Sequence, residues 1–135
     1  KPSSAASDVY KRQEQTYQQV LTAQKTAIQT VALGKTLGEI DQTARQILAQ
    51  DNLAQFFSHN LGHGIGLSCH EYPALAPNEA LPIEKNMTFT IEPGVYLPAS
   101  GFGIRIEDDV VVNDAGHAEI LTQFNKEWMT IDCNG

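Results

Sequence analysis

Three side chains, His63, Glu92 and Glu107, are the residues whose types and spacing could do chemistry. Glu92 follows His63 by 29 residues and precedes Glu107 by 15, and each stands in a segment punctuated by glycine or proline. One imidazole and two carboxylates are donors that suit a divalent manganese, cobalt, zinc or iron ion. They make up most of a metal site. A site for two ions would need more carboxylates than the first 58 residues obviously supply.

Two further histidines stand close to His63 in the sequence. His59, His63 and His70 are three of the four histidines of the chain, and glycines alternate with them. Glycine lets the backbone approach a ligand closely and adopt positive φ. A single histidine is more often an ordinary core or surface residue, but this clustering favours a binding site.

Strand periodicity gives the two glutamates a way to meet. Residues 87–92 alternate so that Thr90 and Glu92 share a face, and residues 102–112 alternate so that Arg105 and Glu107 share a face. If the two strands are neighbours, the carboxylates converge, and a divalent cation would offset the cost of burying them. A solvated sheet face, or an ion pair with Arg105, is the simpler alternative.

Helical patterns precede these strands. Apolar residues at spacings of three and four predict a helix over residues 14–33 that ends at Gly34. Thr36 and Glu39 form a capping-box pattern, which predicts a second helix to about Gln50. A turn at residues 113–116 precedes a closing strand at 117–121. Two helices followed by mostly antiparallel strands indicate an α+β fold.

Composition narrows the class of protein. The 135 residues carry 16 acidic and 9 basic side chains, for a net charge of −7, and no basic run offers a surface to nucleic acid. No apolar stretch has the length of a membrane span. The two cysteines, Cys69 and Cys133, do not make a disulfide framework, which favours a reducing, cytoplasmic compartment.

The first residues differ from the rest. Residues 1–13 are polar, lack the periodicity that follows and resemble a translated sequencing adapter. We expect them to be a non-native or disordered leader, and residues 14–135 to be the C-terminal part of a domain whose preceding part is missing.

Three motifs together carry a family resemblance. H-x3-H-G-I-G-L-x2-H-E-x-P, T-I-E-P-G-V-Y and G-I-R-I-E-D-D resemble the C-terminal half of a pita-bread-fold metallopeptidase. The chain is most similar to the proline-specific branch, Xaa-Pro aminopeptidase and Xaa-Pro dipeptidase (prolidase), over about residues 14–131. The resemblance implies a truncated pita-bread fold with a curved sheet, and a full-length protein that is a homodimer or larger and cleaves proline-containing peptides.

The same resemblance assigns roles. His63, Glu92 and Glu107 would be metal ligands, with Glu107 bridging two divalent ions, manganese first among them. Glu92 would also act as general base. His59 and His70 would contact the substrate or stabilise the tetrahedral intermediate, and Arg105 would hold the substrate end or the adjacent carboxylate.

One departure bears on activity. Family members supply two further aspartates from upstream strands, and Asp8 is the only acid of the region before residue 14. The chain alone is therefore expected to bind at most one ion weakly and to hydrolyse little or nothing. Two alternatives stay open: a non-catalytic pita-bread module that binds a protein, and a creatinase-type amidinohydrolase, because parts absent from this chain shape the substrate pocket.

Overall fold

Two helices precede a series of short strands in a computed structural model, which describes residues 4–65, 73–122 and 126. The elements are α1 (Ser4–Thr30), α2 (Leu37–Gln50), the 3₁₀ helix η1 (Ala54–Phe56), β1 (Gly62–His63), β2 (Ala74–Leu75), β3 (Thr88–Ile91), β4 (Gly94–Leu97), the 3₁₀ helix η2 (Pro98–Ser100), β5 (Phe102–Arg105), β6 (Asp108–Val112) and β7 (Ala118–Ile120). All the paired strands are antiparallel. The prediction of an α+β fold is confirmed.

The capping box starts α2 as the sequence predicts. The Thr36 hydroxyl accepts from the Glu39 amide at 3.1 Å, and the Glu39 carboxylate accepts from the Thr36 amide at 2.9 Å. Two of the orphan amides at the start of the helix are thus satisfied. The apolar side chains of α2 face the core. Leu37, Ile40, Ala44 and Leu48 are fully buried, and Ile47 is partly buried.

Helix α1 differs from its prediction at both ends. It begins at Ser4 instead of residue 14, and it ends at Thr30 instead of Leu33. Residues 5–13 contain no glycine or proline, so the helix continues through them although they have no apolar stripe. Residues 6–12 are exposed, which is why the apolar pattern marks only the packed part. The expectation that residues 1–13 are non-native stays a prediction.

The strands form a long antiparallel ribbon. β3 pairs with β6 and β4 pairs with β5 in one common register, and the two-stranded pieces meet where the Ile106 amide donates to the Pro93 carbonyl at 3.2 Å. Residues 102–112 are therefore two strands, β5 and β6, and the prediction of a single strand was wrong. Pro93 has no N–H, so the ladder cannot continue regularly opposite Ile106.

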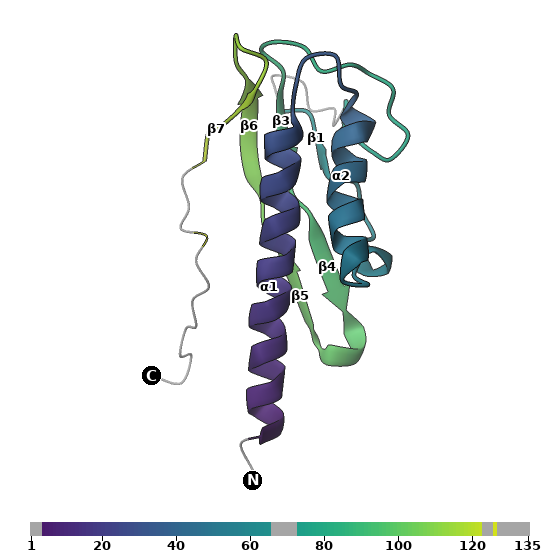
Figure 1. Ribbon diagram of the computed structural model, residues 1–135, viewed down its shortest axis with the longest axis vertical. Coiled ribbons are helices and arrows are strands. Elements are labelled where there is room, and N and C mark those ends of the chain that lie inside the picture. Colours follow the sequence, from purple (N-terminus) through teal and green to yellow (C-terminus); the bar gives the residue numbers. More distant parts are fainter. Residues whose placement is uncertain (1–3, 66–72, 123–125, 127–135) are drawn as a thin grey trace.

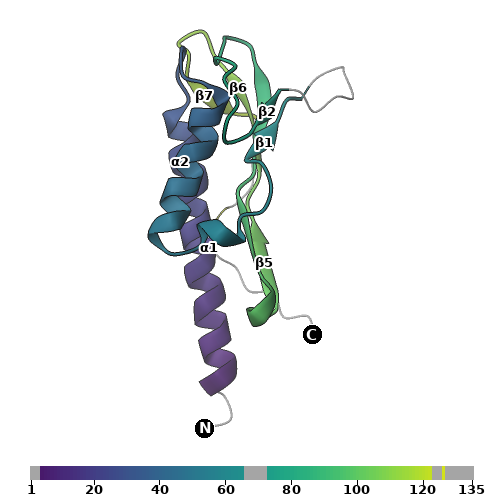
Figure 2. The same cartoon turned by 90° about the vertical axis from the view of Figure 1, so that its right-hand side faces the viewer.

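Helices and strands lie in two layers (Figures 1 and 2). α1 and α2 pack side by side on one face of the strands. Phe89, Ile91 and Val110 are fully buried in a core shared with both helices. No described helix covers the opposite face of the ribbon, which carries the alternate residues. None of the helices in residues 4–65 and 73–122 is long and apolar enough to cross a membrane.

Candidate metal centre

The common register of the ribbon places the two glutamates opposite each other. Continuing the pairing of β3 with β6 by one residue sets Glu92 across from Glu107, on the face away from the helices. Directly opposed side chains lie close together in an antiparallel pair. The sequence argument required the two strands to be neighbours, and they are.

His63 reaches the same face because β1 lies unusually close to β3. The His63 amide donates to the Thr90 hydroxyl at 3.0 Å, and the Glu92 amide donates to the Leu61 carbonyl at 2.7 Å. A Cβ at Gly62 would lie 2.7 Å from the Thr90 carbonyl carbon and closer still to its oxygen, so only glycine fits. The His63 Nε2 atom then lies 3.7 Å from the Glu92 Oε2 atom.

Hydrogen bonding sets the tautomer of His63. The Nδ1 atom lies 3.1 Å from the Gly64 carbonyl oxygen, which can only accept, so the proton of the neutral ring belongs on Nδ1. The Nε2 lone pair is then free and faces Glu92. A backbone carbonyl that holds the other ring nitrogen is the usual support of a metal-binding histidine.

The electrostatics of Glu107 show how close the charges are. Burial raises the pKa of the Glu107 carboxyl above its ordinary value, and the charges of Glu92 and then Asp109 raise it further. Arg105 and His63 lower the pKa but do not cancel the rise. Two facing carboxylates therefore repel each other in the metal-free chain, and a cation bound between them would relieve that repulsion.

The donors fit a divalent ion in type and in the face they share. Among residues 4–65, 73–122 and 126, however, no three histidine, cysteine, aspartate or glutamate side chains are close enough to enclose one ion. His63 and Glu92 face each other, and Glu107 interacts with both electrostatically. The described part of the chain thus supplies donors without a closed ligand set.

A cavity of about 400 Å³ adjoins these donors. Its lining combines imidazole, carboxylate and guanidinium groups: His59, Asn60, Gly62, His63, Ala74, Glu92 and Arg105. A larger hollow of about 500 Å³ lies along α1 and the end of α2, but its lining includes no histidine. We assign the site to the smaller cavity because histidine, glutamate and arginine side chains line it.

His59 stands at the rim of this cavity with both ring nitrogens occupied. Nδ1 lies 2.7 Å from the Asn60 carbonyl oxygen, so it donates, and Nε2 lies 2.9 Å from the Tyr96 hydroxyl, which donates to it. Tyr96 is a site residue that the sequence reasoning missed. Its signal was strand parity, since it lies two positions beyond Gly94 and four beyond Glu92.

Glycines make room for the Tyr96 ring. A Cβ at Gly103 would lie 2.8 Å from the Tyr96 Cδ1 atom, and a Cβ at Gly94 would lie 2.9 Å from the hydroxyl oxygen. A side chain at either position would therefore crowd the Tyr96 ring in the place where it bonds to His59. His70, Cys69 and Cys133 lie outside the described residues.

Several known proteins are similar to this chain in sequence and in fold. The model of metallopeptidase family M24 matches residues 4–114. An Xaa-Pro dipeptidase of Pyrococcus furiosus is 40% identical over 116 residues, which cover 86% of this chain and 33% of that protein. The solved prolidase of Pyrococcus horikoshii OT3 matches with a TM-score of 0.82 at 38% identity, over 88% of this chain and 34% of the other. The solved X-Pro aminopeptidase of Thermotoga maritima MSB8 matches with a TM-score of 0.78 at 41% identity, over 86% and 32%.

The two-layer fold is part of the pita-bread fold of these metallopeptidases. This chain belongs to metallopeptidase family M24. It spans about a third of the length of the curated relatives it matches, 31% to 33%.

Proposed function

We propose that the complete protein hydrolyses peptide bonds whose nitrogen belongs to proline. The observation that carries the proposal is the free Nε2 lone pair of His63, which faces the Glu92 carboxylate with Glu107 opposite it. Membership of family M24, and similarity to proteins named Xaa-Pro dipeptidase and prolidase, support the choice of reaction.

The proposed roles are those that the family resemblance implies, and the positions of His63, Glu92 and Arg105 support them. His63, Glu92 and Glu107 would hold divalent metal, manganese first, and two such ions would polarise the scissile carbonyl and acidify a water molecule. The Glu92 carboxylate would accept a proton from that water. Arg105, on the cavity wall, would attract the carboxylate end of a short peptide.

Imidazoles would assist at the other side of the reacting bond. His59 and His70 would contact the substrate, and an N–H of His70 would stabilise the negative charge that develops on the substrate oxygen. In the described structure Tyr96 already occupies the Nε2 atom of His59, so a substrate must share or displace that hydroxyl. We further propose a homodimeric or larger, cytoplasmic complete protein.

A substrate panel tests the proposal. The complete protein, loaded with manganese, should hydrolyse Xaa-Pro dipeptides or longer Xaa-Pro peptides and leave matched Xaa-Ala peptides and creatine intact. E92Q should abolish turnover, whereas the exposed β7 variant E119Q should match the native protein. Turnover of creatine alone would identify an amidinohydrolase, and no turnover of any substrate would favour a protein-binding module.

The chain alone should behave differently. The chain supplies one imidazole and two carboxylates, and neither of the two further aspartates that the resemblance implies is assigned to one of its residues. We therefore propose that it holds at most one ion, weakly, and has no turnover. Calorimetric titration of the 135-residue chain with manganese checks this directly. Two tight sites would contradict it.

A further inference from the structure

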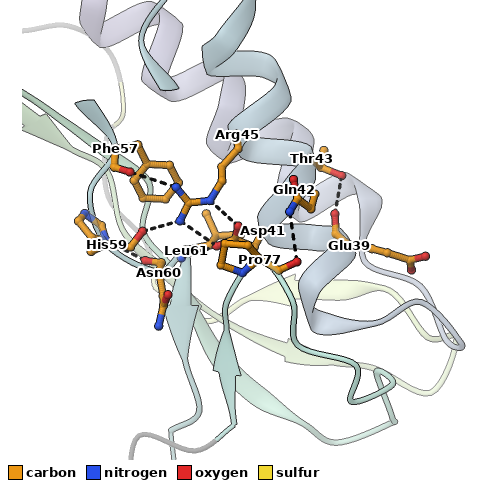
Figure 3. A network of polar contacts seen from close by, with 10 residues as sticks. All are labelled: Glu39, Asp41, Gln42, Thr43, Arg45, Phe57, His59, Asn60, Leu61 and Pro77. Carbon is orange, nitrogen blue, oxygen red and sulfur yellow. Dashed lines mark hydrogen bonds and ion pairs between the residues drawn. The ribbon is translucent and has the colours of Figure 1, made fainter. Parts of the chain in front are cut away.

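Helix α2 carries a buried ion pair beside the candidate metal centre. Asp41 is fully buried and Arg45, one turn later, has a side chain 21% exposed. The Arg45 Nε atom donates to Asp41 Oδ1 at 2.6 Å, and an Nη2 hydrogen bond of 3.3 Å completes a two-pronged contact with the carboxylate. We call this pair the α2 clamp (Figure 3).

The α2 clamp binds one irregular segment at alternate residues. Arg45 donates to the Phe57 carbonyl at 3.0 Å and to the His59 carbonyl at 2.7 Å, and Asp41 accepts from the Leu61 amide at 3.0 Å. These groups lie between η1 and β1, where the backbone forms neither helix nor strand. The clamp therefore supplies bonds that regular structure would otherwise provide.

Contacts between side-chain rings connect the α2 clamp to the candidate metal centre. The Arg45 guanidinium lies 4.2 Å from the centroid of the Phe57 ring, and the Phe57 ring meets the His59 ring edge to face at 5.0 Å. The His59 ring in turn bonds to Tyr96. Leu61 also accepts the Glu92 amide, so the same segment borders a candidate metal ligand.

Stability alone does not explain such a pair. A buried ion pair contributes little more than apolar residues of the same volume would, because removing two charges from water offsets their attraction. A planar guanidinium can, however, bind a carboxylate and two carbonyls at once, which a lysine ammonium on a flexible stem cannot do with the same geometry.

We propose that the α2 clamp positions His59. By fixing the backbone of residues 57–61 it holds the His59 ring at the cavity rim, in the tautomer with the proton on Nδ1. Asp41 and Arg45 are positioning residues, since neither lines the cavity. The kinetic part of the inference rests on the proposed function, whereas the geometric part does not.

Nitrogen-15 NMR of the histidine rings in the 135-residue chain, at a pH where they are neutral, tests the geometry. The native chain should show His59 protonated on Nδ1. R45K keeps the positive charge beside Asp41 but loses the planar guanidinium that binds two groups at once. It should move His59 toward the Nε2-protonated form, while His117, which follows the turn after β6, is unchanged. Native-like His59 signals in R45K would overturn the proposal, because charge neutralisation would then suffice.

A neighbouring residue of α2 provides the matched control. Gln42 donates to the Pro77 carbonyl at 3.2 Å, in a loop that carries none of the candidate site residues (Figure 3). Q42A should leave the His59 signals as they are. An equal change in Q42A and R45K would mean that any loosening of α2 disturbs His59, and would overturn a specific role.

Kinetics in the complete protein complete the test. R45K, corrected for its folded fraction by circular dichroism, should lower kcat on an Xaa-Pro dipeptide about 10- to 100-fold with KM nearly unchanged, as loss of an orienting partner does. Q42A should be native-like. If the native protein cleaves no Xaa-Pro peptide, the proposed function fails while the NMR result still decides the inference. If the native protein cleaves these peptides and R45K cleaves them at the native rate, the inference about the α2 clamp fails while the proposed function stands.

Discussion

Replacing Gly62 by alanine tests the close approach that brings His63 to the site. The new Cβ would lie 2.7 Å from the Thr90 carbonyl carbon, against about 3.4 Å for ordinary contact, so β1 must withdraw by at least about 0.7 Å. The His63 amide bond to Thr90, 3.0 Å long, would then stretch to about 3.7 Å and cease to be a hydrogen bond.

Two effects of G62A, the loss of hydrogen bonds and overpacking, should lower the free energy of unfolding. The 2.9 Å bond from the Ile65 amide to the Thr88 carbonyl would stretch past the limit in the same way, and two lost bonds cost about 1–3 kcal/mol. Residual overpacking adds about 1–3 kcal/mol, so we expect G62A to lower the free energy of unfolding by about 4 kcal/mol. Urea denaturation of the chain measures this.

G101A is the matched control for the same substitution. Gly101 has a φ of 73° and no atom within 4 Å of an added Cβ, so its replacement adds only the left-handed backbone cost of about 1–2 kcal/mol. If G62A is no less stable than G101A, the steric reasoning is wrong. In the complete protein G62A should also weaken manganese binding, which G101A should not.

Three further outcomes are expected. Burial and the charge of Glu92 raise the pKa of Glu107, so the folded chain holds that proton to a higher pH than the unfolded chain, and stability falls as pH rises through the folded pKa. E107Q should therefore be more stable than the metal-free native chain at about pH 7 and equal to it at about pH 3, by urea denaturation. T36A should lower the free energy of unfolding by about 1 kcal/mol by removing the capping box. T43A, at a half-buried position on the same helix where the hydroxyl donates to the Glu39 carbonyl, should lower it by less than about 0.5 kcal/mol; equal effects would discount the cap. Asp108 is fully buried, with partners on α1 and beyond β7, so D108A should cost about 3 kcal/mol or more in a thermal or urea melt, and a loss under 1 kcal/mol would show that its partners re-pair.

Local patterns predicted the parts of the fold that local forces decide. Alternation placed Glu92 and Glu107 on the correct faces because a strand has a period of two, and the Thr36 capping box marked the start of α2 because both of its bonds are local. The start of α1 was wrong because a helix needs no apolar face to continue. The break at Pro93 was visible on its own strand, but its effect on the partner strand depends on pairing.

Long-range contacts decided what the sequence reasoning missed. Tyr96 meets His59 across 37 residues, and Asp41 meets Leu61 across 20. A signal for Asp41 was nevertheless available, since it lies four residues after Leu37 and three before Ala44, inside the apolar stripe of α2. A charged residue at such a position indicates a buried partner.

The common register on both sides of Pro93 has a consequence for protein engineering. Since side chains alternate, one residue inserted or deleted within only one of the two paired strands, for example beside Glu92 but not beside Glu107, would turn the side chains beyond it to the opposite face. A carboxylate would then enter the helix-covered core and an isoleucine or valine would enter the cavity. Changes of loop length should instead be made at the tip, Pro98–Ser100, where the two strands join and where added residues leave all the pairs below them in place.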